Sequence, residues 1–305
     1  MRRWPLSAHG VTRWLIAWGL MCLTALAALP VSAAGQTEEL LIGIEPEHNI
    51  FKQMERYRAL AGYLSGQLGV KVNLTIMSRY GEVIKRFKSL NLDGAFLTSY
   101  TATMGIRELD LQPVANPVNR NGESTAQGYI FVRKDSGIRD VKDMEGKSIV
   151  FVDPATMEGY LFPLAYLRQR GITDPEKYFN RFIYSGSHAS TIFAVLDGRA
   201  DIGAAKNTVF DKLVDNDPSI AQELSIIARS PKVPEITLCI KNEIAGDLRA
   251  RLSEVLLRMD KTPQGQNVLN QFEALRFIES SKADFATVEA MALEALPGTA
   301  EHGKE

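Results

Sequence analysis

Short apolar runs alternate with amphipathic stretches along most of the chain. Residues 40–44 and 70–76 have the length and composition of strands, and the apolar positions between Phe51 and Leu68 recur at helical spacing. The same alternation continues along the chain. Further strands are predicted at residues 95–97, 129–132, 148–152, 182–184 and 202–205, and a helix is predicted at residues 160–170. This alternation predicts an α/β fold with largely parallel sheets, and helical patterns fill most of residues 245–296.

Two segments of the chain repeat one pattern. Tyr80 precedes a helical stretch and then Asp93, and His188 precedes Asp201 at the same spacing of 13 residues. A single repeat of this kind can arise by chance, but two similar α/β lobes would also produce it. In that arrangement each lobe points a helix N-terminus and the carboxyl end of a strand at a shared cleft, where open α/β sheets bind their ligands.

The N-terminus has the layout of a secretory signal peptide. Three arginines within the first 13 residues precede an apolar run over 15–29, and small residues follow it. A transmembrane anchor is the alternative, but the run is shorter than the roughly 20 residues that a bilayer requires. We therefore expect residues 1–34 to be a cleaved signal peptide that exports the chain to the periplasm. The polar residues 297–305 are expected to form a flexible tail.

Composition and charge narrow the choice of function. The chain is 45% hydrophobic and 23% charged, as soluble globular proteins are. Removing the three arginines of residues 1–34 takes the net charge from −1 to −4, which argues against a nucleic-acid partner. Removing Cys22 with them leaves Cys239 without a second cysteine, and its apolar neighbours predict a small buried side chain. Three histidines remain, too few for a multi-histidine metal cluster, so no metal or cofactor is expected.

No catalytic motif stands out. The sequence has no Gly-x-Ser-x-Gly, no His-Glu-x-x-His, no phosphate loop and no dinucleotide-binding glycine pattern. These motifs carry nucleophilic, metal-assisted and nucleotide-dependent chemistry. Their absence favours a protein that binds a ligand over an enzyme that transforms one.

Several segments, taken in order, resemble the phosphonate-, phosphite- and phosphate-binding proteins of ABC importers, which form the PhnD-like family. The segments that carry the resemblance are residues 42–46, 57–64, 68–70, 93–100, 151–156, 159–163, 178–179, 185–188 and 194–201. Each segment alone is a weak signal, but together they cover roughly residues 40–240. The resemblance implies a substrate-binding protein, expected to be a monomer, that captures a small anionic ligand for an ABC permease and its ATPase.

The resemblance also implies a type 2 periplasmic binding protein fold, with two α/β lobes joined by a two-segment hinge around a central cleft. Lobe 1 would comprise residues 38–124 and 233–296, and lobe 2 would comprise residues 125–232. The crossings would lie near 123–128 and 229–234, and the lobes would close on the ligand by a hinge motion. A receptor that presents its ligand to a membrane sensor is the alternative, because the same fold serves both roles.

Lobe 2 supplies most of the expected ligand contacts. Thr156 and Met157 lie between a predicted strand and a predicted helix, where unpaired backbone N–H groups and the helix dipole attract anions. Thr156 adds a hydroxyl, and a plain helix cap, the common alternative role for it, does not exclude binding. His188 occupies the family's ligand position and can donate to an oxyanion. Thr208 follows the strand over 202–205 and completes this set.

Lobe 1 is expected to contribute Tyr100 and Ser99 from a strand end and Tyr80 from a helix start. Tyr100 can offer its phenolic O–H, or it can simply pack on the sheet edge. Glu235 lies about where the family can place an acid that receives a ligand amine. His48, in the loop after the first strand, is expected to be solvated.

The chain departs from the family pattern at the anion loop. Met157 and Glu158 stand where Thr-Ser is usual, Thr98 replaces a common Pro, and Ala189 replaces the usual Asp. Met157 has no side-chain donor, and Glu158 would repel a bound anion unless it turned away. Lys206 could supply a compensating charge, although most lysines are solvated. The identity of the oxyanion therefore stays open.

Overall fold

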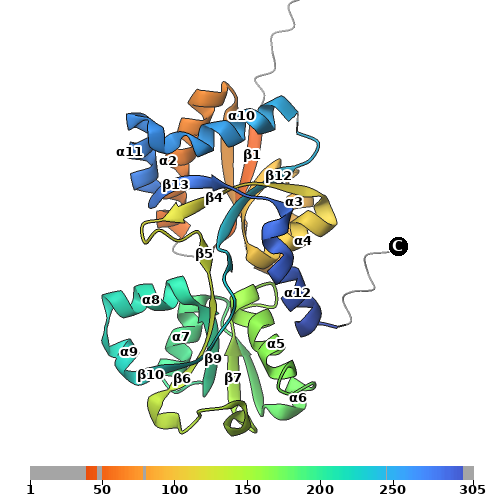
Figure 1. Cartoon of the computed structure of the whole chain (residues 1–305), viewed down its shortest axis with the longest axis vertical. Helices are drawn as coiled ribbons and strands as arrows, with labels where there is room; N and C mark the ends of the chain where they lie inside the picture. Colours follow the sequence, from red (N-terminus) through yellow and green to blue (C-terminus); the bar gives the residue numbers. More distant parts are fainter. Residues whose placement is uncertain (1–38, 47–49, 78–79, 245, 298–305) are drawn as a thin grey trace, which may run out of the picture. The chain divides into compact units, whose positions relative to one another are not determined.

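The computed structural model describes residues 39–46, 50–77, 80–244 and 246–297 (Figure 1). The predicted signal peptide, His48 and residues 298–305 of the predicted tail lie outside this part of the chain. The compact unit described below begins at Glu39. Within it, no described helix is both long enough and apolar enough to cross a membrane.

A six-stranded sheet with its helices forms what we call lobe 1. The strand order is β13-β4-β12-β3-β1-β2. The strands are β1 (Glu39–Ile44), β2 (Lys71–Ile76), β3 (Gly94–Thr98), β4 (Leu111–Asn119), β12 (Ile236–Lys241) and β13 (Ala274–Glu279). The helices are α2 (Ile50–Leu68), α3 (Val83–Ser89), α4 (Ser99–Leu109), α10 (Gly246–Leu257) and α11 (Pro263–Phe272), with short 3-10 turns η1 (Tyr80–Glu82), η5 (Met259–Lys261) and η6 (Lys282–Phe285).

A five-stranded sheet with its helices forms lobe 2. Its strand order is β10-β6-β9-β7-β8. The strands are β6 (Gly128–Arg133), β7 (Ser148–Phe151), β8 (Arg181–Tyr184), β9 (Ile202–Lys206) and β10 (Leu224–Arg229). The helices are the π-helix η4 (Met157–Leu161), α5 (Phe162–Arg168), α6 (Pro175–Tyr178), α7 (His188–Leu196), α8 (Asn207–Asn216) and α9 (Ser219–Glu223), with 3-10 turns η2 (Lys134–Ser136) and η3 (Val141–Met144).

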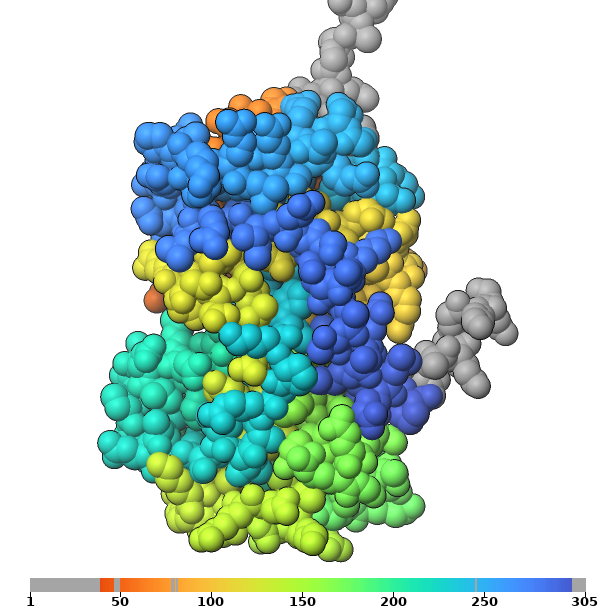
Figure 2. Space-filling model, viewed as in Figure 1, coloured from red at the N-terminus to blue at the C-terminus, as the bar shows by residue number. Residues whose placement is uncertain are grey.

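Two chain segments connect the sheets. β5 (Thr125–Ala126) and β11 (Val233–Pro234) pair antiparallel where the chain leaves lobe 1 and where it returns. The last helix, α12 (Ala286–Ala295), contacts α4 of lobe 1 and both α5 and η4 of lobe 2. Arg168 Nε donates to the Ala295 carbonyl at 3.0 Å and holds the end of this helix on lobe 2. Figure 2 shows the blue C-terminal segment against the green helices of lobe 2.

The α/β class predicted from the sequence is confirmed, but the prediction of largely parallel sheets is wrong. β1 is parallel to β2 and β3, and β7 is parallel to β8 and β9, whereas the other pairs of described strands are antiparallel. The reason lies in the connections. β6 and β12 carry the chain from a crossing into a sheet, so they run opposite to neighbours that point toward the crossing.

Helices fill most of residues 245–296, as predicted, but the strand β13, which the sequence pattern did not indicate, also lies within that range. A bulge between Ala274 and Arg276 breaks the regular alternation of this strand. The buried residues Ala274 and Phe277 are consequently three positions apart, a spacing that resembles a helix more than a strand.

The repeated pattern found in the sequence has a structural basis. In lobe 1, Asp93 Oδ2 accepts a hydrogen bond from Leu41 N at 2.8 Å. In lobe 2, Asp201 Oδ2 accepts from Ser148 N at 2.8 Å and from Ser148 Oγ at 2.6 Å. Each aspartate precedes an inner strand and accepts from the backbone of the parallel strand beside it. The repeated pattern therefore marks equivalent strand pairs, which are β1 with β3 in lobe 1 and β7 with β9 in lobe 2.

Apolar clusters cover both faces of each sheet. Cys239 of β12 is fully buried in one of them, together with Met77 and Phe87, and burial raises the pKa of its thiol. The prediction of a small buried side chain at this position is confirmed.

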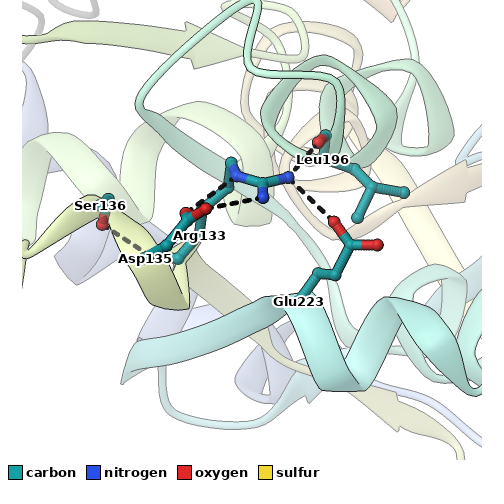
Figure 3. A network of polar contacts seen from close by, with 5 residues as sticks. All are labelled: Arg133, Asp135, Ser136, Leu196 and Glu223. Atoms are coloured by element: carbon teal, nitrogen blue, oxygen red, sulfur yellow. Dashed lines mark hydrogen bonds and ion pairs between the residues drawn. The ribbon is translucent and has the colours of Figure 1, made fainter.

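Charged contacts lie at the outer surface of lobe 2. Arg133, at the end of β6, donates to both carboxylate oxygens of Asp135, to Glu223 of α9 and to the carbonyl of Leu196 at the end of α7 (Figure 3). The guanidinium hydrogen bonds lower the pKa of Asp135. One arginine thus ties the end of β6 to the ends of two helices.

Gly159 allows η4 to lie directly against β7 and the residue that follows it. A Cβ atom at this position would approach Val152 Cγ2 to 2.4 Å and Val152 Cβ to 2.6 Å. Such distances are far inside van der Waals contact, so a side chain here would displace the helix start.

We expect Gly159→Ala to lower the free energy of unfolding by about 1–3 kcal/mol, the usual cost of overpacking a core. Gly62→Ala in α2 is the matched control, because a Cβ there meets nothing within 4 Å. That control should stabilise the protein by up to about 1 kcal/mol through helix propensity. Urea unfolding of both variants measures the difference, and a neutral Gly159→Ala would contradict the close packing.

Candidate functional site

The carboxyl ends of the parallel strands of both lobes carry the predicted site residues. Tyr80 of lobe 1 and His188 of lobe 2 lie edge to face, with ring centroids 6.3 Å apart. Tyr80 also packs against Val152 and Ala155 of lobe 2. Both rings are buried, with 4% and 2% of their surfaces exposed. These two residues, predicted from different lobes, therefore meet.

The orientation of His188 is fixed by the backbone of β9. Lys206 N donates to His188 Nδ1 at 3.0 Å, so Nδ1 is the acceptor. In a neutral imidazole with an accepting Nδ1, the proton lies on Nε2. His188 begins α7, whose N-cap Ser187 accepts from Ser190 N. The histidine thus presents an Nε2–H donor, which is the group that an oxyanion requires.

Thr156 and Met157 form the start of η4. Thr156 is 2% exposed, and its hydroxyl donates to the Asp153 carbonyl at 2.7 Å. The Met157 side chain is fully buried in the apolar cluster of lobe 2, so it can face a ligand only through its backbone N–H. The first N–H groups of a helix have no partner within the helix. The loop therefore offers backbone donors at the strand end of lobe 2.

Tyr100 and Ser99 begin α4 in lobe 1. Tyr100 packs in the same apolar cluster as Met157, across the junction between the lobes. Burial raises the pKa of Tyr100, which keeps the phenol protonated and able to donate. Ser99 Oγ is buried and has no hydrogen-bond partner among the residues that the structure describes.

Glu45 is a buried acid at this edge that sequence reasoning missed. It directly follows β1, and its Oε2 accepts from Thr98 N and from Thr101 Oγ1, both at 2.7 Å. Gln53 Nε2 in turn donates to the Glu45 carbonyl at 2.8 Å. The carboxylate thus caps α4 from a strand 53 positions earlier in the sequence. An acid immediately after a strand was the available signal, but only the sheet order reveals which helix it reaches.

Thr208 and Glu235 lie in a separate group. Thr208 Oγ1 donates to Glu235 Oε1 at 2.8 Å, and Asn119 Nδ2 donates to Glu235 Oε2 at 2.5 Å. The carboxylate therefore joins α8 of lobe 2 to the end of β4 in lobe 1. Thr208 and Glu235 line a cavity of about 440 Å³, together with residues that include Arg56 and Asp211. The other predicted ligand contacts do not line this cavity.

Two charged side chains at the lobe 2 strand ends are buried. Lys206 and Glu158 are each only 1% exposed. A solvated lysine was the ordinary expectation for position 206, and the structure contradicts it. Among the described residues, no three His, Cys, Asp or Glu side chains are grouped as the ligands of a metal ion would be.

Two α/β lobes with donors gathered at facing strand ends define a ligand-binding protein that encloses its ligand between lobes. The family model described as "ABC transporter, phosphonate, periplasmic substrate-binding protein" matches residues 42–285. The chain belongs to this family, as its motifs predicted.

Curated relatives agree with this assignment. The phosphonates-binding periplasmic protein of Escherichia coli K12 is 24% identical over 271 residues, which cover 87% of this chain and 79% of that protein. The phosphate-import protein PhnD of Mycolicibacterium smegmatis is 28% identical over 189 residues, 59% of each protein.

Solved structures confirm the fold. A binding protein component of an ABC phosphonate transporter from Pseudomonas aeruginosa has a TM-score of 0.73 and 20% identity, over 85% of this chain and 87% of that chain. PhnD1 from Prochlorococcus marinus in complex with methylphosphonate has a TM-score of 0.69 and 21% identity, over 84% of this chain and 97% of that chain. The predicted type 2 periplasmic binding protein fold with two lobes is therefore confirmed.

The hydrogen bond from Lys206 N to His188 yields a stability prediction. His188→Ala leaves a buried N–H without an acceptor, which should lower the free energy of unfolding by about 1–3 kcal/mol. His188→Asn places an amide oxygen near the position of Nδ1 and should retain most of that stability. Urea unfolding of the ligand-free protein compares the two variants, and equal losses would contradict the assigned role of Nδ1.

Proposed function

We propose that this protein is the periplasmic substrate-binding component of an ABC importer, and that it captures a small phosphorus oxyanion by hinge closure. Family membership supports the transport role, and relatives named for phosphonate, phosphate and phosphite support the ligand class. The observation that carries the proposal is the orientation of His188 at the junction of the lobes, where an accepting Nδ1 leaves the ring proton on Nε2.

In the proposed complex, lobe 2 holds the oxyanion. His188 Nε2–H and the first backbone N–H groups of η4, including that of Met157, donate to its oxygens. The Thr156 hydroxyl joins them by rotating away from the Asp153 carbonyl. Tyr80, Tyr100 and Ser99 close over the ligand from lobe 1, and their hydroxyls supply the remaining donors.

Thr208 and Glu235 contact the part of the ligand that extends toward the 440 Å³ cavity. We propose hinge crossings near residues 123–128 and 229–234, with lobe 1 comprising residues 38–124 and 233–296 and lobe 2 comprising residues 125–232. The bridging position of Glu235 beside the second crossing supports a hinge there.

The rest of the proposal concerns the setting of the protein. It is exported by a cleaved signal peptide within residues 1–34, acts as a monomer and delivers its ligand to a permease and an ATPase. It performs no catalysis, in keeping with a family of substrate-binding components.

Calorimetry on residues 38–305 tests the ligand class. Titration with methylphosphonate, phosphite and phosphate should give one-to-one binding for at least one of them, with sulfate as the comparison anion. The bound ligand should also raise the thermal midpoint, because it binds only the native state. No heat and no midpoint shift with any of the three would refute the oxyanion assignment.

Thr156→Ala should weaken oxyanion binding by about 1–3 kcal/mol, the cost of losing a hydrogen bond to a charged group. Thr262→Ala is the matched control, because Thr262 caps α11 by accepting from Gly265 N at 3.0 Å. The control should lose about 1 kcal/mol of stability and no affinity. Calorimetry and urea unfolding of both variants separate the two roles, and unchanged affinity in Thr156→Ala would remove this residue from the site.

A further inference from the structure

The charged side chains of Glu158 and Lys206 lie on one face of the lobe 2 sheet. Side chains alternate between the two faces of a strand. In β9, Ile202 and Ala204 belong to the apolar cluster of Met157 and Leu161, whereas Ala205 belongs to the cluster on the opposite face. Lys206 therefore shares the face of Ile202 and Ala204, and η4 contacts β9.

Gly128 shows how near the two residues are. It pairs with Lys206 across the ladder of β6 and β9, and paired Cβ positions lie about 5 Å apart. A Cβ on Gly128 would lie 3.1 Å from Glu158 Cα and 3.0 Å from the Glu158 carbonyl. Lys206 and Glu158 thus flank the same small gap that Gly128 keeps open, within the reach of a lysine side chain.

Both charges are removed from water, each with 1% of its residue surface exposed. A buried charge is strongly unfavourable alone, and an opposite charge in the same low-dielectric space offsets that cost over several ångströms. We propose that Lys206 neutralises Glu158, so that an acid can occupy the anion loop without repelling the oxyanion. The two residues together set the net charge that the ligand meets in lobe 2.

This inference rests on the proposed function for its ligand measurement, and a double-mutant cycle tests it. Lys206→Met leaves Glu158 uncompensated beside the ligand and should weaken oxyanion binding by about tenfold or more. Glu158→Gln leaves the lysine charge uncompensated and should strengthen binding by about threefold or more. The double variant should bind within about threefold of the original protein, since neither charge remains.

Lys142→Met and Glu145→Gln are matched controls, because both side chains are exposed on lobe 2, and neither should change affinity. The proposal is overturned if Lys206→Met weakens binding by the same factor in the original protein and in the Glu158→Gln variant, because the lysine would then act on the ligand independently of the acid. It is overturned equally if neither single variant changes affinity.

Thermal unfolding without ligand keeps the test independent of the oxyanion. Lys206→Met should lower the midpoint more than the double variant does, and if Lys206→Met alone does not fold, the double variant should fold. A double variant less stable than Lys206→Met would overturn the pairing. If the unmodified protein binds none of the tested oxyanions, the proposed function fails while this thermal cycle still decides the charge pair.

Discussion

The backbone amides at the ends of the two inner strands must be satisfied where the lobes meet, and the site depends on how each lobe does this. In lobe 1, Thr98 N donates to the Glu45 carboxylate. At the equivalent position in lobe 2, Lys206 N donates to the His188 imidazole. One amide is satisfied by an anion and the other by a neutral ring. The two lobes are alike in backbone and differ in the charge of the acceptor, which is negative in lobe 1 and neutral in lobe 2.

This difference assigns separate tasks to the lobes. The start of α4 already holds a protein carboxylate, so its dipole is compensated before any ligand arrives. In the proposed complex, the oxyanion therefore lies against the start of η4 and the Nε2–H of His188. In that complex, lobe 1 would serve mainly to cover the ligand with phenol groups, which donate without adding charge. The raised pKa of Tyr100 agrees with that role.

Much of the fold and some of the site could be predicted from the sequence because their signals are local. Helical spacing, strand runs and the Tyr80 and His188 helix starts each occupy a short stretch. The antiparallel neighbours of β6 and β12 could not be predicted, because strand order depends on where the chain crosses between lobes. The buried roles of Glu45 and Lys206 depend on contacts with residues distant in the sequence, and a single charged position carries no sign of them.

The junction between the lobes is crossed by more than the two predicted hinge segments. Glu235 joins Asn119 to Thr208, and α12 contacts both α4 and η4. Because η4 begins with Met157 and α4 begins with Ser99 and Tyr100, α12 touches elements of both lobes that carry proposed ligand contacts. The proposed hinge motion would therefore change the contacts of α12 with one lobe and strain the bridge through Glu235. If the lobes close by that motion, closure on a ligand and packing of the C-terminal helix are coupled.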